Sequence, residues 1–243
     1  MEEIVEALTQ QQEELSALLV TADLDLPSAC AGWSIGDVVL HLAHTNDLAI
    51  ASAEGRLPAV AAVPPAGAID DGADALVARE RGRQSGAELV ARWEEGTFAL
   101  RRALLACDPS ARLQWVAGTL AARTLATTRL AETWIHTGDI AYGMGVRLAP
   151  QPRLRHIARL AHRTLPYAFE REGLTMSGPV AFRLTGPDGA AWDFGDDEAP
   201  TVIRGDGVEL CHVASRRVPP GDTALVGTGP DAQAVLAVVR TWA

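Results

Sequence analysis

The sequence has no apolar run long enough to cross a membrane. Its longest nearly apolar stretches, 59–63 and 232–239, fall well short of the roughly 20 residues that a membrane-spanning helix needs. The first residues, Met1-Glu2-Glu3-Ile4, contain neither the basic nor the apolar segment of a secretory signal. We therefore expect a cytoplasmic protein that has no membrane partner.

Cysteine and basic residues are also scarce. The three cysteines, Cys30, Cys107 and Cys211, form no C-x-x-C pair, which argues against a disulfide framework and against a cysteine zinc site. We interpret them as small buried apolar residues. Lys and Arg number 21 against 31 Asp and Glu, giving a net charge of -10. A nucleic acid held through its phosphates is therefore not an expected partner.

What is present is an ordinary globular composition with strong helical periodicity. The 243 residues are 48% apolar and 21% charged, enough for one large domain or two modest ones. Apolar residues recur at helical spacing over four early segments: 3–20, 35–53, 85–107 and 121–142. Capping-box patterns open the second and third of these helices at Ser34 and Ser85. Four long helices in succession predict a bundle.

Between the second and third helices, segment 57–72 is rich in proline, glycine and alanine without an apolar period, which predicts a loop. A fifth helix is expected over 154–169, where Pro166 can introduce a kink.

The character of the chain changes near Gly178. Short β-prone runs follow, and together they predict a meander: 180–185, 191–194 and 201–204. Helical patterns over 208–215 and 231–242 flank a further short strand at 224–226. We therefore predict a mostly α protein, with a helical bundle over residues 1–150 and a small α+β domain over 151–243 that begins with a helix.

The fourth helix carries a polar stripe. Its members, spaced by three, four and three residues on one helical face, are Arg129, Glu132, His136 and Asp139. The rest of the helix is mostly apolar, so the stripe should be buried, and unpaired buried charges are costly. Either the stripe hydrogen-bonds internally through Arg129, or Glu132 and His136 bind a divalent cation.

A third metal ligand could come from the H-x-x-H sequence of the second helix. His41 lies at the edge of the apolar stripe of that helix, whereas His44 turns toward Asp47 on the outer face. His41 is thus the better inward-facing ligand, although it could simply hydrogen-bond across the bundle. Two histidines and one glutamate would leave coordination positions open, as in catalytic sites. The other three histidines are interpreted as surface or packing residues: His156, His162 and His212.

Two segments carry a resemblance to a known family. Segments 32–43 (GWSIGDVVLHLA) and 132–140 (ETWIHTGDI) together resemble the maleylpyruvate isomerase family of mycothiol-dependent enzymes, which have a DinB-like four-helix bundle that binds a metal. Segments 154–158 (LRHIA), 222–225 (DTAL) and 227–232 (GTGPDA) extend the similarity toward an actinobacterial metal-binding subgroup. The resemblance thus covers most of the chain.

The resemblance implies a divalent metal, zinc above all, held by His41, Glu132 and His136, the positions that match the family's ligands. Asp139 also matches a family position, and it would accept a hydrogen bond from the ring of His136.

The family's C-terminal domain resembles a sterol carrier and contributes an arginine to the site. Arg216 is the nearest match to that arginine, and Arg217 is almost as good. An arginine there would suit a carboxylate on the substrate.

These features favour a metal-dependent enzyme in which mycothiol is the nucleophile for isomerisation or S-transfer on a small electrophilic substrate. Two alternatives stay open at this point. The metal could activate water in a hydrolase or lyase, or it could be structural in a non-catalytic protein whose C-terminal domain holds an apolar ligand. A fourth protein ligand such as His44 would favour the structural alternative. We expect a monomer or a homodimer.

Overall fold

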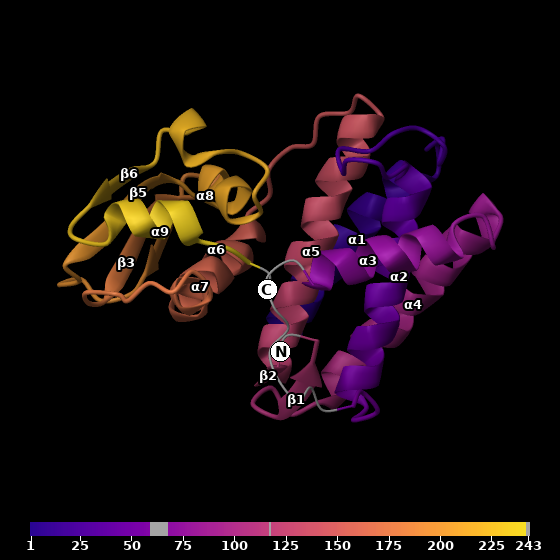
Figure 1. Ribbon diagram of the computed structural model, residues 1–243, viewed down its shortest axis with the longest axis horizontal. Helices are drawn as coiled ribbons and strands as arrows, with labels where there is room; N and C mark the ends of the chain where they lie inside the picture. The colour runs from indigo at the N-terminus through magenta and orange to yellow at the C-terminus, as the bar shows by residue number, and fades with distance from the viewer. Residues whose placement is uncertain (59–67, 117, 242–243) are drawn as a thin grey trace. The chain divides into compact units, whose positions relative to one another are not determined.

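The structure is a computed structural model that describes residues 1–58, 68–116 and 118–241, without the side chains of 68–70 (Figure 1). The chain divides into two compact units, Met1–Leu148 and Ala149–Ala243. Each unit buries apolar side chains of its own, with Trp93 in the core of the first and Trp192 in that of the second.

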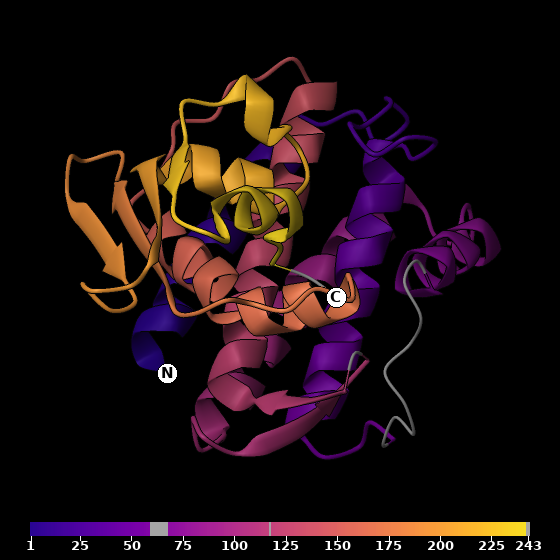
Figure 2. The same cartoon turned by 60° about the vertical axis from the view of Figure 1, so that its left-hand side comes forward.

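Four long helices build the first unit. They are α1 (Glu2–Leu19), α2 (Ile35–Ala53), α4 (Gly86–Ala106) and α5 (Ala122–Gly143). Both α1 and α2 pack against α4 and α5, as Figures 1 and 2 show. The four predicted helices are confirmed, and so are both capping boxes, in which Ser34 pairs with Asp37 and Ser85 with Glu88.

Three described elements of the first unit were not predicted, one helix and two strands. Helix α3 (Ala68–Glu80) shows that the loop prediction for 57–72 is wrong from residue 68 onward, while 59–67 lie outside the described residues. Apart from the buried Val77, α3 has little apolar periodicity from which a sequence pattern could predict it. Strands β1 (Arg112–Trp115) and β2 (Gly118–Ala121) form an antiparallel hairpin beside α2 and α5 (Figure 2).

The second unit begins with two helices and continues with a four-stranded sheet. Its helices are α6 (Leu154–Arg163), α7 (Leu165–Arg171), α8 (Gly207–Ala214) and α9 (Ala232–Val238), with a 3-10 turn, η1 (Pro220–Asp222). The predicted fifth helix is broken between α6 and α7, next to Pro166. Its strands are β3 (Val180–Thr185), β4 (Ala191–Phe194), β5 (Thr201–Asp206) and β6 (Val226–Thr228). The predicted final helix ends at Val238, and Trp242 lies outside the described residues.

The sheet is not the predicted meander. Its strand order is β4-β3-β5-β6, and β5 runs parallel to β3, with Val180 opposite Thr201. Segment 195–200 carries the chain from β4 past β3, with Gly195 at a positive φ of 82°. In β4, Trp192 and Phe194 are buried and alternate with exposed residues, so one face of this strand packs inward. The prediction of a mostly α protein with a small C-terminal α+β part is nevertheless confirmed.

Among the described helices, none is both long and apolar enough to cross a membrane.

The end of α5 packs closely on the loop that precedes α2. A Cβ added to Gly143 would lie 2.3 Å from the carbonyl oxygen of Pro27, closer than real contacts allow. In the same region the Ala29 amide donates to the carbonyl of Asp139 at 3.1 Å. Glycine at 143 therefore lets the loop reach the helix turn that carries Asp139.

We expect Gly143→Ala to lower the free energy of unfolding by about 1–3 kcal/mol, because the added methyl group must push the loop away. Gly138→Ala is the matched control, since it lies on the same helix and a Cβ there meets nothing within 4 Å. This control should raise the free energy of unfolding by roughly 0.5–1 kcal/mol, because alanine is the better helix former. Urea unfolding measures both changes, and shifts of the same sign would contradict the packing argument.

Candidate metal centre

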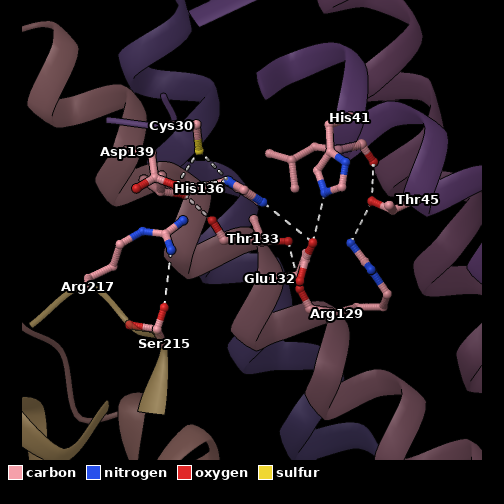
Figure 3. A network of polar contacts seen from close by, with 12 residues as sticks. Cys30, His41, Thr45, Arg129, Glu132, Thr133, His136, Asp139, Ser215 and Arg217 are labelled. Carbon is pink, nitrogen blue, oxygen red and sulfur yellow. Dashed lines mark hydrogen bonds and ion pairs between the residues drawn. The ribbon is translucent and has the colours of Figure 1, made fainter. Parts of the chain in front are cut away.

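Helices α2 and α5 bring one carboxylate and two imidazoles together inside the first unit. His41 comes from α2, and Glu132 and His136 lie one turn apart on α5 (Figure 3). The His41 Nε2 atom is 2.8 Å from Glu132 Oε1, and the His136 Nε2 atom is 3.5 Å from the same oxygen. Potential ligand atoms of the three residues all lie within 4.8 Å of one another. The three residues that the sequence singled out as ligands are therefore neighbours in space.

Contacts behind the ligand atoms orient both rings. His136 Nδ1 donates to Asp139 Oδ2 at 2.9 Å, and the Asp139 carboxylate is almost fully buried. This bond leaves Nε2 as the His136 nitrogen that faces Glu132. The His41 ring packs against Trp33 at 5.3 Å between centroids, and its buried Nδ1 has no hydrogen-bond partner in the described part of the chain.

The electrostatics of the cluster are dominated by burial and by these hydrogen bonds. Burial alone would raise the pKa of Glu132, but the hydrogen bonds from His136 and His41 lower this pKa well below its usual value. Burial alone would lower the pKa of His136, but its bonds to Asp139 and Glu132 raise this pKa well above its usual value. In His41, burial has the largest effect and lowers the pKa. A metal ion at this cluster would compete with a proton for the ring nitrogen of His136.

The donor set fits a divalent metal, zinc in particular. Zinc takes imidazole nitrogen and carboxylate oxygen at about 2.0–2.2 Å, so its ligand atoms lie about 3.3 Å apart in a tetrahedral site. The separations of 2.8 and 3.5 Å from Glu132 to the two histidines bracket that value. Three protein ligands would leave a coordination position open to a small molecule.

His44 does not join this cluster. It is half-buried, and burial has the largest effect on its pKa, which is lowered. Four charged side chains have smaller effects on the pKa of His44: Asp47, Arg92, and Arg79 and Glu80 of α3. Among the described residues, the only potential metal ligands that are grouped with Glu132 are His41 and His136. No fourth protein ligand of the kind that a structural metal site needs therefore joins these three within the part of the chain that the structure describes.

Cys30 is a neighbour of the centre that the sequence analysis missed. The sequence predicts a small buried apolar residue at this position, but the half-buried Cys30 Sγ donates to Asp139 Oδ2 at 3.1 Å and lies 3.8 Å from His136 Nδ1. The only sequence signal was its position two residues before the Gly32-Trp33 motif. Cys30 and Trp33 also help to line a cavity of about 550 Å³.

The two candidate arginines lie in the second unit. Arg216 adopts a positive φ of 59° directly after α8, and its guanidinium donates to the carbonyls of Ala237 and Val238 at the end of α9. Arg217 donates to the carbonyl of Ser215. The Arg216 guanidinium thus caps a helix end within its own unit. Its role in the reaction stays a prediction, as does that of Arg217.

Two relatives in Mycobacterium tuberculosis match nearly the whole chain. They are uncharacterized proteins of strains CDC 1551 / Oshkosh and H37Rv, and each is 32% identical over 245 aligned residues. Each alignment covers 97% of this chain and 93% of the relative.

Two solved structures share the fold. A mycothiol-dependent maleylpyruvate isomerase superposes with a TM-score of 0.61 at 16% identity, covering 94% of this chain and 95% of that one. A histidine-to-alanine mutant of a mycothiol-dependent maleylpyruvate isomerase gives a TM-score of 0.59 at 17% identity and covers 89% of each chain. The family model of the mycothiol maleylpyruvate isomerase N-terminal domain matches residues 5–141, which include all three candidate ligands. The chain therefore belongs to the mycothiol maleylpyruvate isomerase family.

Proposed function

We propose that this protein is a metal-dependent enzyme that uses a low-molecular-weight thiol, mycothiol, for isomerisation or S-transfer on a small electrophilic substrate that carries a carboxylate. The observation that carries the proposal is the convergence of His41, Glu132 and His136 in a member of this family. The incomplete ligand set supports catalysis rather than a structural role for the metal. The cytoplasmic location, the oligomeric state and the absence of nucleic-acid and membrane partners stay predictions of the sequence.

A divalent ion held by His41, Glu132 and His136 would lower the pKa of a bound thiol, so that the thiolate is available at neutral pH. Asp139 contributes by holding the His136 ring with Nε2 directed at Glu132. The Cys30 thiol donates to the same Asp139 oxygen and so fixes the carboxylate in place. These contacts preorganise the donor set before any ligand arrives.

The chemistry that we propose is addition of the thiolate to an electron-poor double bond. Addition forms a carbon–sulfur bond and turns the double bond into a single bond about which the substrate can rotate. Expulsion of the thiolate restores the double bond in the other geometry, which is an isomerisation. Protonation of the adduct at carbon, with retention of the sulfur, is an S-transfer.

A cavity lies next to two residues that contact the centre, and we propose that it holds part of the thiol. It is lined by Cys30 and Trp33, which contact Asp139 and His41, and by Arg81 and Leu89 among others. Its volume of about 550 Å³ lies within the usual range for small-molecule sites.

We expect mycothiol to bind the metal-loaded protein and not the chelator-treated protein, because the cation provides both the attraction and the pKa shift. Because binding as the thiolate releases the thiol proton, affinity should rise with pH and level off only near the free thiol's pKa, roughly 8.5 for an unperturbed cysteine-type thiol. Calorimetry measures binding, and the cobalt-substituted protein should gain a thiolate-to-metal charge-transfer band. A metal-loaded protein that gives neither heat nor band would contradict the thiol assignment and favour activation of water.

A further inference from the structure

A buried guanidinium lies one turn before Glu132 on α5. Arg129 is only 2% exposed, and within the described residues its side chain makes one hydrogen bond, from Nη2 to Thr45 Oγ1 at 2.8 Å. Its Nε is buried without any hydrogen-bond partner among the described residues. A buried cation with an unsatisfied donor is unfavourable unless another group compensates it. The structure therefore contains positive charge and hydrogen-bonding capacity that the bundle itself does not use.

Glu132, the carboxylate nearest to Arg129 in the sequence, already contacts two histidines. Glu132 Oε1 contacts both His41 and His136, and Arg129 makes no ion pair with it within the described chain. The Arg129 charge nevertheless acts on the centre, because it contributes to lowering the pKa of both His41 and Glu132. In Figure 3 the Arg129 guanidinium points to Thr45, and Glu132 follows one turn later on the same helix. Arg129 is thus close enough to act on a ligand of the centre.

The guanidinium is held in one orientation. Thr45 Oγ1 donates to the carbonyl of Leu42 at 3.2 Å, which leaves a lone pair of this hydroxyl for Arg129. On the β1 strand, the Trp115 ring lies 6.0 Å from the Arg129 Cζ atom, the limit for a cation–π contact. A guanidinium oriented in this way loses little entropy when it binds a planar anion.

We propose that Arg129 binds a carboxylate of the substrate, so that the bundle itself provides an anion anchor beside the metal centre. This inference rests on the proposed function, because that function assigns the electrophilic part of the substrate. Binding of the carboxylate requires only the Arg129 guanidinium. A forked, always charged guanidinium matches a carboxylate better than any other side chain does. The anchor would select substrates in which a carboxylate lies a short, fixed distance from the electrophilic carbon.

The test measures binding of succinate, a dicarboxylate that cannot react with thiols, and of its neutral analogue succinamide. Calorimetry is done without thiol on zinc-loaded and chelator-treated protein. Arg129→Gln should weaken succinate binding by about tenfold or more, the usual loss for a charge-assisted hydrogen bond, in both metal states. Succinamide binding should not change. Arg123→Gln on the same helix is the matched control and should leave both affinities at the wild-type value.

Two further variants decide the question if Arg129→Gln does not fold. Arg129→Lys keeps the charge but not the fork, and Thr45→Val keeps the arginine but removes its hydrogen-bond acceptor. Both should fold and should weaken succinate binding several-fold. Wild-type succinate affinity in any folded Arg129 variant, or no succinate binding by the wild-type protein, would overturn the anchor.

The outcomes also separate this inference from the proposed function. Thiol binding without an effect of Arg129 on succinate overturns the anchor and leaves the thiol-dependent enzyme in place. Succinate binding that depends on Arg129, in a protein that does not respond to mycothiol, overturns the thiol assignment and keeps the anchor.

Discussion

The His136→Ala protein is expected to purify without bound divalent metal, whereas the wild-type chain should hold about one equivalent. Removal of the imidazole takes away one of three donors and leaves the buried Asp139 carboxylate without its hydrogen-bond donor from His136. Loss of one ligand leaves only two protein donors, too few to hold the ion through dialysis against metal-free buffer. Elemental analysis after dialysis against metal-free buffer measures the occupancy. Full occupancy in His136→Ala would overturn the assignment of the ligands.

The matched control is His44→Ala. His44 lies one turn after His41 on α2, so the same substitution is made on a neighbouring histidine outside the cluster. This variant should keep about one equivalent of metal. Loss of metal in His44→Ala would instead indicate a fourth protein ligand and support a structural role for the ion.

Trp93→Ala should lower the free energy of unfolding by about 3–5 kcal/mol, the usual cost of emptying a large aromatic site in a core. Trp93 lies on α4, is 1% exposed and belongs to the apolar cluster that includes Val38 and Leu42 of α2. Its removal leaves a cavity behind the helix that carries His41. Chemical denaturation of the metal-free protein measures the effect without a contribution from metal binding.

Phe98→Ala is the control for this substitution, because Phe98 lies on the same helix but is 73% exposed. Its ring contacts the Arg101 guanidinium at the surface, 4.6 Å from the ring centroid, so the change should stay within about 0.5 kcal/mol. A loss of less than about 1 kcal/mol in Trp93→Ala, below the usual range for aromatic core truncations, would contradict the placement of this tryptophan in the core.

Much of the bundle could be predicted from the sequence because local physics specifies it. Apolar residues at helical spacing and the capping boxes at Ser34 and Ser85 locate the long helices, and the same residues have the same effect in any compact fold. The spacing of Glu132, His136 and Asp139 is likewise a property of one helix, so their common face follows from the sequence.

The elements that the sequence did not predict depend on contacts with distant residues. Helix α3 is supported at Asp74, which accepts from Trp33 Nε1, and just beyond its end at Arg81, which pairs with Asp37. The parallel pairing of β5 with β3 is chosen by the sheet as a whole, because a strand pattern does not specify which edge it joins.

The sequence by itself determined which residues could form a site: a histidine on the second helix and a charged stripe on the fourth. Only the tertiary structure decided how they are used. It brings His41, which helical geometry already favoured over His44, against Glu132, and it adds the Cys30 thiol to Asp139. It also directs Arg129 to Thr45 and not to the carboxylate with which the sequence could pair it. The physical reason is that helical spacing specifies the face of a side chain, whereas its partner depends on which helix packs against that face.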